Sequence, residues 1–338
     1  MAVPSAGTFT AAALQKVQVL ADRVWRDNIG NARYMAHVDS LLAIQKEGTA
    51  SGAFRELQTE KDKTVRLVWL DACSDTTEAC SDDCTIGGAE LSADAKDYTL
   101  NICQQTGFNV KEKATRSSEF DREMHVAMGM LNAIKNLDEY LNSQVLAAIE
   151  TNRGANEYFP SGWSETSSDT VVPSSDFTRR MIPRLIQTGT RNRFNNPFIL
   201  SGENLWYEKW DAMTNAGNLD GKGDAAAFGA LRIYHDLFNL DAANDPDFKT
   251  YLISQGALAF VSKAYYTTPV DYFTNSRYSV PSNSIPGVRY DVVYTNTCTS
   301  NEMIHKFSLY ANAGIFLNPT GCSETRTGIL SFLKEDAI

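Results

Sequence analysis

Cysteines are the residues of this sequence whose types and spacing come closest to a chemical site. Cys73, Cys80 and Cys84 lie in one acidic stretch, spaced C-x6-C-x3-C, and Cys103 follows further along the chain. Structural zinc sites prefer two short Cys-x2–4-Cys pairs, and only one short pair is present, with no histidine nearby. Free thiols or one disulfide at a loop tip are therefore favoured, with structural zinc as the alternative.

Six cysteines in 338 residues are sparse compared with scaffolds that depend on disulfides. In a reducing compartment the default for such cysteines is a free, mostly buried thiol. This usage is consistent with folding in the cytoplasm.

Other candidates for chemistry fail on their surroundings. The glycine-rich stretch 217–230 matches neither a phosphate-binding loop nor a dinucleotide fingerprint, and its Asp220, Lys222 and Asp224 do not continue as a calcium loop. No G-x-S-x-G or H-E-x-x-H motif occurs. Four scattered histidines share no ligand spacing, and a lone histidine supplies no acid/base partner: His37, His125, His235 and His305. We predict no catalytic, cofactor-binding or metal-binding residue and no enzyme activity.

Composition narrows the class of protein further. Hydrophobic residues make up 43% and charged residues 21%, which describes a foldable globular chain. The net charge of −10 repels phosphate, so a sequence-specific reader of nucleic acid is disfavoured, whereas the wall of a nucleic-acid container is compatible with it. The sequence has no run of 18 apolar residues and no signal-peptide pattern at its start. We therefore expect no membrane segment and synthesis in the cytoplasm.

One stretch, residues 117–153, would position much of the rest. Its apolar residues recur near one stripe of a 3.6-residue period, while Asp138 and Asn142 are expected largely off that stripe. Ser117 or Ser118 can cap the first turn. A helix of roughly 34 residues would be about 50 Å long. Because average helices have about 11–12 residues, this one is interpreted as a spine that crosses a whole domain.

A long hairpin is predicted before the spine. Residues 65–70 alternate as a strand, a second strand begins at Tyr98, and an extended segment follows from Phe108. We interpret residues 60–112 as a hairpin with an acidic tip. Residues 9–50 resemble a helical arm that packs on something else rather than forming its own core.

Mixed elements are predicted after the spine. We expect a crossover at 156–177, helices at 178–190, from an N-cap at Ser201, and at 225–240, and either a buried helix or a strand bent at Gly256 over 248–266. The last seventy residues are rich in predicted strands, and the spine's stripe should face Ile329 and Phe332. The fold class is α+β with two interleaved subdomains. Many aromatic residues crowd the C-terminal lobe, where core packing or subunit contacts could use them.

This order of elements resembles the major capsid proteins of tailed double-stranded DNA bacteriophages with the HK97-type fold. The resemblance rests on the arm, the hairpin, the spine, the α/β lobe and terminal strands at GIFLNPTGC and TGILSFL, not on a short motif. It implies an N-terminal arm at 1–55, an extended loop at 56–112, a peripheral domain at 113–175 and 311–338, and an axial domain at 176–310.

The resemblance also implies partners and location. Such chains assemble into hexamers and pentamers of an icosahedral shell that encloses DNA without reading its sequence, alongside portal, scaffold and decoration proteins. The shell is the virion capsid, made in the host cytoplasm, and no membrane or cofactor is implied. A nanocompartment shell of the same fold and another virion part, such as a tail or neck protein, are the alternatives.

Overall fold

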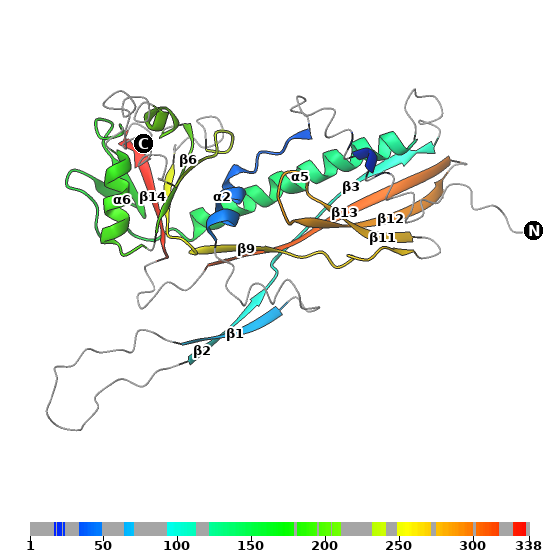
Figure 1. Cartoon of the computed structure of the whole chain (residues 1–338), viewed down its shortest axis with the longest axis horizontal. Coiled ribbons are helices and arrows are strands. Elements are labelled where there is room, and N and C mark those ends of the chain that lie inside the picture. The colour runs from blue at the N-terminus through cyan, green and yellow to red at the C-terminus, as the bar shows by residue number, and fades with distance from the viewer. Residues whose placement is uncertain are drawn as a thin grey trace, which may run out of the picture. The chain divides into compact units, whose positions relative to one another are not determined.

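The computed structural model of the chain is drawn in Figure 1. Besides single residues between 17 and 23, it describes 34–48, 64–70, 93–112, 122–178, 181–194, 196–203, 205–210, 232–240, 249–271, 275–299, 302–317 and 327–335.

The chain forms two compact units, each assembled from separated segments. Unit 1 comprises 1–38, 100–144 and 261–314, and unit 2 comprises 39–99, 145–260 and 315–338. Both units combine helix and sheet, so the predicted α+β class with interleaved subdomains is confirmed.

Unit 1 is built on a sheet with the strand order β10-β11-β12-β13-β3, and β9 pairs with β13 off this path. Its strands are β3 (Ile102–Lys111), β9 (Leu258–Ser262), β10 (Val270–Asp271), β11 (Asn275–Pro281), β12 (Arg289–Thr299) and β13 (Glu302–Leu317). The neighbours along the main path all pair antiparallel, with β13 between β12 and β3. The predicted strands near 289–317 are confirmed.

The long helix α5 (Arg122–Thr151) lies along this sheet, as Figure 1 shows. It has 30 residues, which confirms the predicted spine, although Ser117 and Ser118 lie outside the described residues. Five of the expected stripe residues are buried: Leu131, Leu137, Leu141, Val145 and Ile149. The prediction for Asp138 and Asn142 is wrong, because both are fully buried. Asp138 precedes Leu141 by three residues and Val145 by seven, so it lies on the stripe itself.

Unit 2 contains a second sheet, with the order β4-β5-β14-β8-β6-β7. Its strands are β4 (Ser164–Thr166), β5 (Asp169–Val172), β6 (Phe198–Ser201), β7 (Ile233–His235), β8 (Thr250–Ile253) and β14 (Ile329–Lys334). The unit also holds α2 (Asp39–Glu47), α6 (Met181–Arg191) and the two-stranded ribbon of β1 (Thr64–Leu70) and β2 (Ala93–Thr99). β1 and β2 pair antiparallel over seven residue pairs, which confirms that this part of the predicted hairpin is a hairpin.

Strand alternation gives the second sheet two different faces. One face carries the apolar core that also includes α6 and Leu205: Trp163, Val172, Phe177, Met181, Ile182, Leu185, Ile199, Leu205, Ile233, Leu252, Leu330 and Phe332. The opposite face carries the alternate residues, among them Tyr234, Tyr251 and Ser331. α2 and the last turns of α5 contact this opposite face, because Glu47 bonds Tyr234 and Glu150 bonds Tyr251.

The C-terminal strand lies elsewhere than predicted. β14 inserts between β5 and β8, parallel to the former and antiparallel to the latter. Phe332 consequently packs in the core with α6, at 5.9 Å from the ring of Trp163, and not on the spine's apolar stripe. The prediction failed because an apolar run identifies a strand but not the sheet edge that its backbone completes.

The boundaries of the two compact units do not coincide with those of the expected capsid domains, which stay a prediction. β12 and most of β13 lie in unit 1 with 122–144 of α5, whereas 315–338 lies in unit 2. The expected domains instead joined 311–338 to the spine and placed 176–310 apart from it. The physical reason for the unit boundary is the antiparallel pairing of β13 with β3, which ties residues 304–313 to the sheet along α5.

Three predictions in the α/β lobe have mixed outcomes. The helix at 178–190 is confirmed as α6, and 248–266 forms β8 and β9 with Gly256 in the left-handed region between them (φ 76°). The helix predicted at 225–240 is wrong over its described part, because β7 forms there by pairing parallel with β6. Residues 205–210 are helical, but Ser201 does not cap them: it ends β6, and its hydroxyl lies 3.2 Å from that of Thr250.

At Gly129, α5 approaches a side chain of the first sheet closely. A Cβ at this position would lie 2.6 Å from Cδ2 of Phe108, whose ring stacks on Phe307 at 5.0 Å. The absence of a side chain therefore lets helix and sheet approach closely.

We predict that Gly129→Ala destabilises the protein by up to about 2 kcal/mol. The gain of about 1 kcal/mol in helix propensity is outweighed by about 1–3 kcal/mol of overpacking, because stacking on Phe307 prevents Phe108 from yielding. Chemical denaturation measures the change. In a Phe108→Leu background the same substitution should be neutral or stabilising, and a loss of stability there would contradict the explanation.

Candidate functional site

The cysteine cluster is only partly within the described residues. Cys73, Cys80 and Cys84 lie outside them, so the choice among thiol, disulfide and zinc stays open. Cys103 is an exposed free thiol on β3, and Cys298 on β12 is likewise exposed and free. Across the described ranges no group of three or more His, Cys, Asp or Glu side chains could hold a metal ion.

The four histidines are scattered over the fold. His37 is exposed before α2, and His125 is half-buried on α5. His305 is fully buried on β13, with Nδ1 2.9 Å from the hydroxyl of Tyr294. Burial, assisted by the charge of Lys209, lowers the pKa of His235 to about 4. The glycine-rich stretch 217–230 lies outside the described residues.

The most unusual group in unit 1 is the buried carboxyl of Asp138. Its Oδ1 accepts hydrogen bonds from the hydroxyls of Tyr290 at 2.5 Å and Ser282 at 2.7 Å. Ser282 in turn accepts from the backbone N–H groups of Ser284 and Ile285, so its hydroxyl also shapes the turn between β11 and β12. The carboxyl therefore fastens the middle of α5 to the sheet, and we call this set the Asp138 clasp.

The clasp has the electrostatics of a group kept away from water. Burial raises the pKa of Asp138 to about 6, although hydrogen bonds from Tyr290 and Ser282 oppose the shift. Burial also raises the pKa of Tyr290 well above its usual value, and the neighbouring Asp138 charge adds to that effect. Among the described residues, Oδ2 of Asp138 finds no hydrogen-bond partner. A carboxyl that is fully buried cannot meet a substrate, so the clasp is a structural device.

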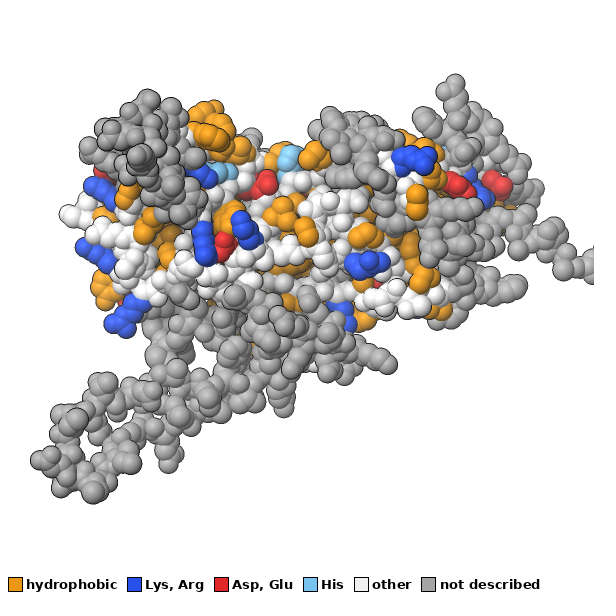
Figure 2. Space-filling view, in the orientation of Figure 1, with side chains coloured by type: hydrophobic (Ala, Val, Ile, Leu, Met, Phe, Trp, Pro, Cys, Tyr) orange, Lys and Arg blue, Asp and Glu red, His pale blue; other side chains and the backbone are white. Residues whose placement is uncertain are grey.

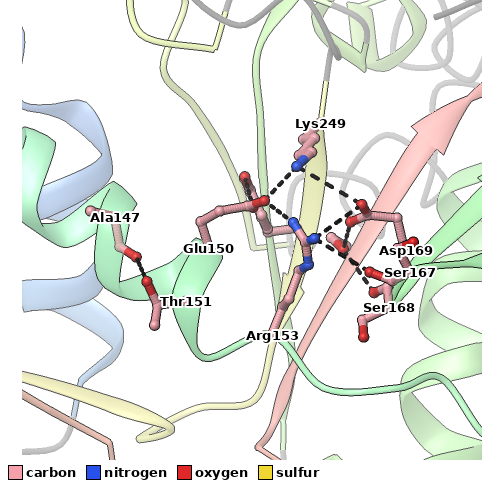
Figure 3. Close-up of polar contacts among 10 residues, drawn as sticks. Ala147, Glu150, Thr151, Arg153, Ser167, Ser168, Asp169 and Lys249 are labelled. Carbon is pink, nitrogen blue, oxygen red and sulfur yellow. Dashed lines mark hydrogen bonds and ion pairs between the residues drawn. The ribbon is translucent and has the colours of Figure 1, made fainter. Parts of the chain in front are cut away.

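The second cluster lies in unit 2, where α5 ends (Figure 3). Lys249 Nζ lies 2.5 Å from Glu150 Oε1 and 3.9 Å from Asp169 Oδ2. Arg153 pairs with the same two carboxylates, lying 3.4 Å from Asp169 Oδ2. The hydroxyl of Tyr251 donates to Glu150 at 2.9 Å. Two anions on α5 and β5 and two cations, one just after α5 and one just before β8, thus neutralise one another.

A strained hairpin turn completes this four-charge cluster. Ser167 and Ser168, between β4 and β5, both have positive φ angles of 52° and 72°, a conformation that favours glycine or asparagine. The Ser167 carbonyl accepts from Arg153, and the Ser168 carbonyl accepts from the hydroxyl of Ser331, which also bonds Asp169 (Figure 3). The turn therefore presents two carbonyls to the cluster at some cost in backbone strain.

A third buried contact attaches α2 to the second sheet. Glu47 accepts from Arg232 at 2.6 Å and from the Tyr234 hydroxyl at 2.5 Å. Ser40 donates its hydroxyl to Asp236 at 2.6 Å. Part of the expected N-terminal arm, residues 39–47, consequently packs within its own unit.

The sequence analysis missed these clusters for two reasons. The sequence did contain an indication of the Asp138 clasp, because a charged residue on the apolar stripe of a long helix is expected to be buried and bonded. The cluster around Lys249 had none, because its residues are separated by up to 99 positions and meet only through the pairing of β5, β14 and β8.

In each of these clusters, side chains of one unit bond one another and hold its helices and strands together. None pairs an exposed nucleophile with a base, which is the arrangement covalent catalysis requires. Within the described residues, no helix is both long and apolar enough to cross a membrane.

Comparisons with known proteins locate similar structures but no matching sequence family. No family model and no curated protein matches this sequence. The structure is similar to a chain of the "Cyanophage A-1(L) capsid asymmetric unit", with TM-score 0.49, 12% identity, and 81% of this chain and 88% of that chain covered. A chain of Mycobacterium phage Che8 has TM-score 0.46 and 13% identity, with 82% of this chain and 87% of that chain covered. A chain from the "Capsid of Ralstonia phage GP4" has TM-score 0.41 and 11% identity, with 80% of this chain and 83% of that chain covered. These sequence identities and TM-scores are low, so they carry no argument about the function of this chain.

We predict that Asp138 makes stability depend on pH. Its folded pKa lies above the unfolded value, so its favourable contribution is complete below about pH 4 and is lost as pH rises through about 6. Relative to Asp138→Asn, which keeps the Oδ1 acceptor, the wild type should lose about 3 kcal/mol between pH 4 and pH 7. Urea unfolding of both proteins across this range measures the difference. Parallel pH profiles would show that the carboxyl does not titrate as described.

We predict that Lys249→Met destabilises unit 2 by about 2–3 kcal/mol, because it leaves Glu150 and Asp169 with one cation between them. The loss is below that of a fully buried pair, since the Glu150 side chain is 36% exposed. Adding Glu150→Gln should restore much of the lost stability, as calorimetry can show. A double variant less stable than the single one would refute charge imbalance as the cause.

Proposed function

We propose that this chain is the major shell protein of a tailed-bacteriophage capsid, with an HK97-type fold. The observation that carries the proposal is the combination of an isolated two-stranded ribbon with a 30-residue helix that lies on a sheet. The order of ribbon, long helix, α/β unit and returning strands is the order that the resemblance implies.

The ribbon is an element without a core of its own. Within the described residues β1 and β2 pair only with each other. A lone two-stranded hairpin is marginally stable in water, so its stabilisation has to come from another surface. A neighbouring subunit is the surface that a shell supplies, through large obligate interfaces. This supports the extended-loop role proposed for 56–112.

The compact units support a division into two functional domains. We propose that the sheet under α5 in unit 1 is the peripheral domain and that the α/β part of unit 2 is the axial domain around the five- and six-fold axes. Residues 1–55 remain the proposed arm, except that 39–47 already pack on unit 2.

Charge supports a container rather than a reader of DNA. The net charge of −10 disfavours tight contact with phosphate, so the shell would enclose the genome without sequence-specific binding. In this role the protein is structural and not an enzyme, forms hexamers and pentamers, meets portal, scaffold and decoration proteins, and is made in the host cytoplasm before it becomes part of the virion. A nanocompartment shell with protein cargo, or a tail or neck protein, is the competing assignment.

Electron microscopy of the purified recombinant protein tests the proposal. Closed icosahedral particles are the expected result, and nucleic acid rather than enzyme cargo inside particles from infected cells distinguishes capsid from nanocompartment. Tubes would assign the chain to a tail. A monomer at all concentrations, with or without added scaffold, would overturn the shell role.

We predict that the β1–β2 ribbon becomes ordered on assembly. Hydrogen exchange should be fast at its backbone amides in free subunits and slow in particles, because the ribbon gains its covering surface only there. Amides of β12 and β13 are the internal control and should be protected in both states. Full protection of the ribbon in free subunits would contradict this dependence.

A further inference from the structure

Unit 2 carries a concentrated set of exposed apolar side chains. Tyr207 is 62% exposed, Trp210 52%, Phe238 46% and Leu237 44%. These four residues, which we call the aromatic face, are half of the large apolar side chains that stand exposed in the described part of the chain. Hydrophobic side chains gather at the upper margin of this unit, near β6, in Figure 2. Such clustering on a surface marks an interaction site.

Two chain segments form the aromatic face together. Lys209 donates to the carbonyl of Ile233 at 3.3 Å, which links the helical segment 205–210 to β7. Gly202 and Leu240 touch so closely that a Cβ at 202 would overlap the Leu240 carbonyl. Trp206 lies behind the face, with ring centroids 4.9 Å from Tyr207 and 6.1 Å from Trp210. The exposed rings are therefore held in place before any partner binds.

Two cations in the same unit have the complementary chemistry. Arg191 and Arg193 are exposed at the end of α6, and neither forms an ion pair or a cation–π contact within the described residues. The other arginines of this unit whose side chains the structure describes differ, since Arg153, Arg184 and Arg232 each pair with a carboxylate. Arg191 and Arg193 therefore offer two exposed cations on a chain whose net charge is −10.

The backbone around these arginines is fixed. Arg193 has a positive φ of 59°, and its N–H donates to the Thr190 carbonyl at 3.1 Å. Between the two arginines, the buried Asn192 amide donates to Asn156 Oδ1 and to the Thr188 carbonyl, both at 2.9 Å. The guanidiniums therefore stand on a rigid support, which lowers the entropy lost on binding.

The two surfaces are separated along the strands. Arg191 and Arg193 precede β6, whereas the aromatic face is made by the segments that follow β6 and β7, which run parallel. A two-fold dimer could pair the cations of each subunit with the rings of the other, but it would use up both surfaces and stop at two subunits. Pairing of the cations of one subunit with the rings of the next leaves one of each surface free for further subunits, as a ring requires.

We propose that Arg191 and Arg193 of one subunit dock on the aromatic face of a neighbouring copy, in a head-to-tail contact that closes into a ring. This inference rests on the proposed shell function and names the surfaces that join subunits within one ring. Guanidiniums stack on Tyr, Trp and Phe rings by cation–π attraction, and Arg with aromatic residues is the enriched combination at protein interfaces. Glu203 in the same helical segment is also exposed, and its carboxylate would attract the incoming guanidiniums.

A mixing experiment with two variants tests the contact. Arg191→Glu/Arg193→Glu removes the cations and keeps the aromatic face, and Tyr207→Ala/Phe238→Ala does the reverse. Native mass spectrometry should show that each variant alone associates roughly tenfold to a hundredfold more weakly than wild type. An equimolar mixture should form heterodimers and nothing larger, because each pair then holds only one complete contact.

Matched controls isolate the contact from general effects. Lys306→Glu reverses another exposed cation, and Val270→Ala shortens another exposed apolar side chain, at 39% exposure; both should assemble as wild type. Thermal unfolding verifies that each variant folds, and Arg191→Gln/Arg193→Gln with Tyr207→Leu carries the test if the stronger changes do not.

The outcomes separate this inference from the function on which it rests. Variants that each assemble like wild type, a mixture without heterodimers, or a mixture that regains full rings would overturn the head-to-tail contact. Microscopy of the wild-type protein alone decides the shell function. Wild-type shells together with unaffected variants would retain the function and reject this contact.

Discussion

The burial of Asp138 is the constraint on which unit 1 depends. A carboxyl in the middle of a 30-residue helix, fully buried, has to be satisfied by the sheet that covers it. Tyr290 and Ser282 supply hydroxyls, and Ser282 passes the constraint on to the turn between β11 and β12. Gly129 lies nine residues before Asp138 on the same helix. Because it has no side chain, Phe108 of the sheet can approach, and α5 lies close enough for these bonds to form. Polar satisfaction and close packing therefore fix the same register of helix on sheet.

Unit 2 solves a different problem, because its sheet is assembled from distant parts of the chain. β14 enters between β5 and β8, and the charges of Glu150, Lys249 and Asp169 meet across that junction. Partial burial makes each charge costly alone, so the balanced set favours one arrangement of strands over slipped alternatives. The non-glycine left-handed turn at Ser167 and Ser168 is retained because its carbonyls complete the set. Strain in the turn and charge balance belong to one device.

Local periodicity predicted most elements, and long-range pairing decided what it could not predict. The spine, the ribbon, α6 and the strands of 289–317 all follow from patterns within one segment. Residues 233–235 are a strand although their sequence resembles a helix, because β6 offers them a parallel partner. Phe332 lies away from the spine's stripe for the same kind of reason. The clusters at Asp138 and Lys249 depend on which faces meet, and periodicity in one segment contains no such information.

The distribution of charge connects these internal devices with assembly. Arg153, Arg184 and Arg232 are used inside unit 2, each against a carboxylate, so they contribute little attraction outward. Among the described residues of this unit, Arg191 and Arg193 form no ion pair and stand on a rigid backbone, in a protein that is acidic overall. Exposed aromatic rings in the same unit are likewise unusual for a chain that remains alone in water. Described arginines paired inside unit 2, together with exposed cations and rings on its surface, are the combination that the proposed contact between copies requires.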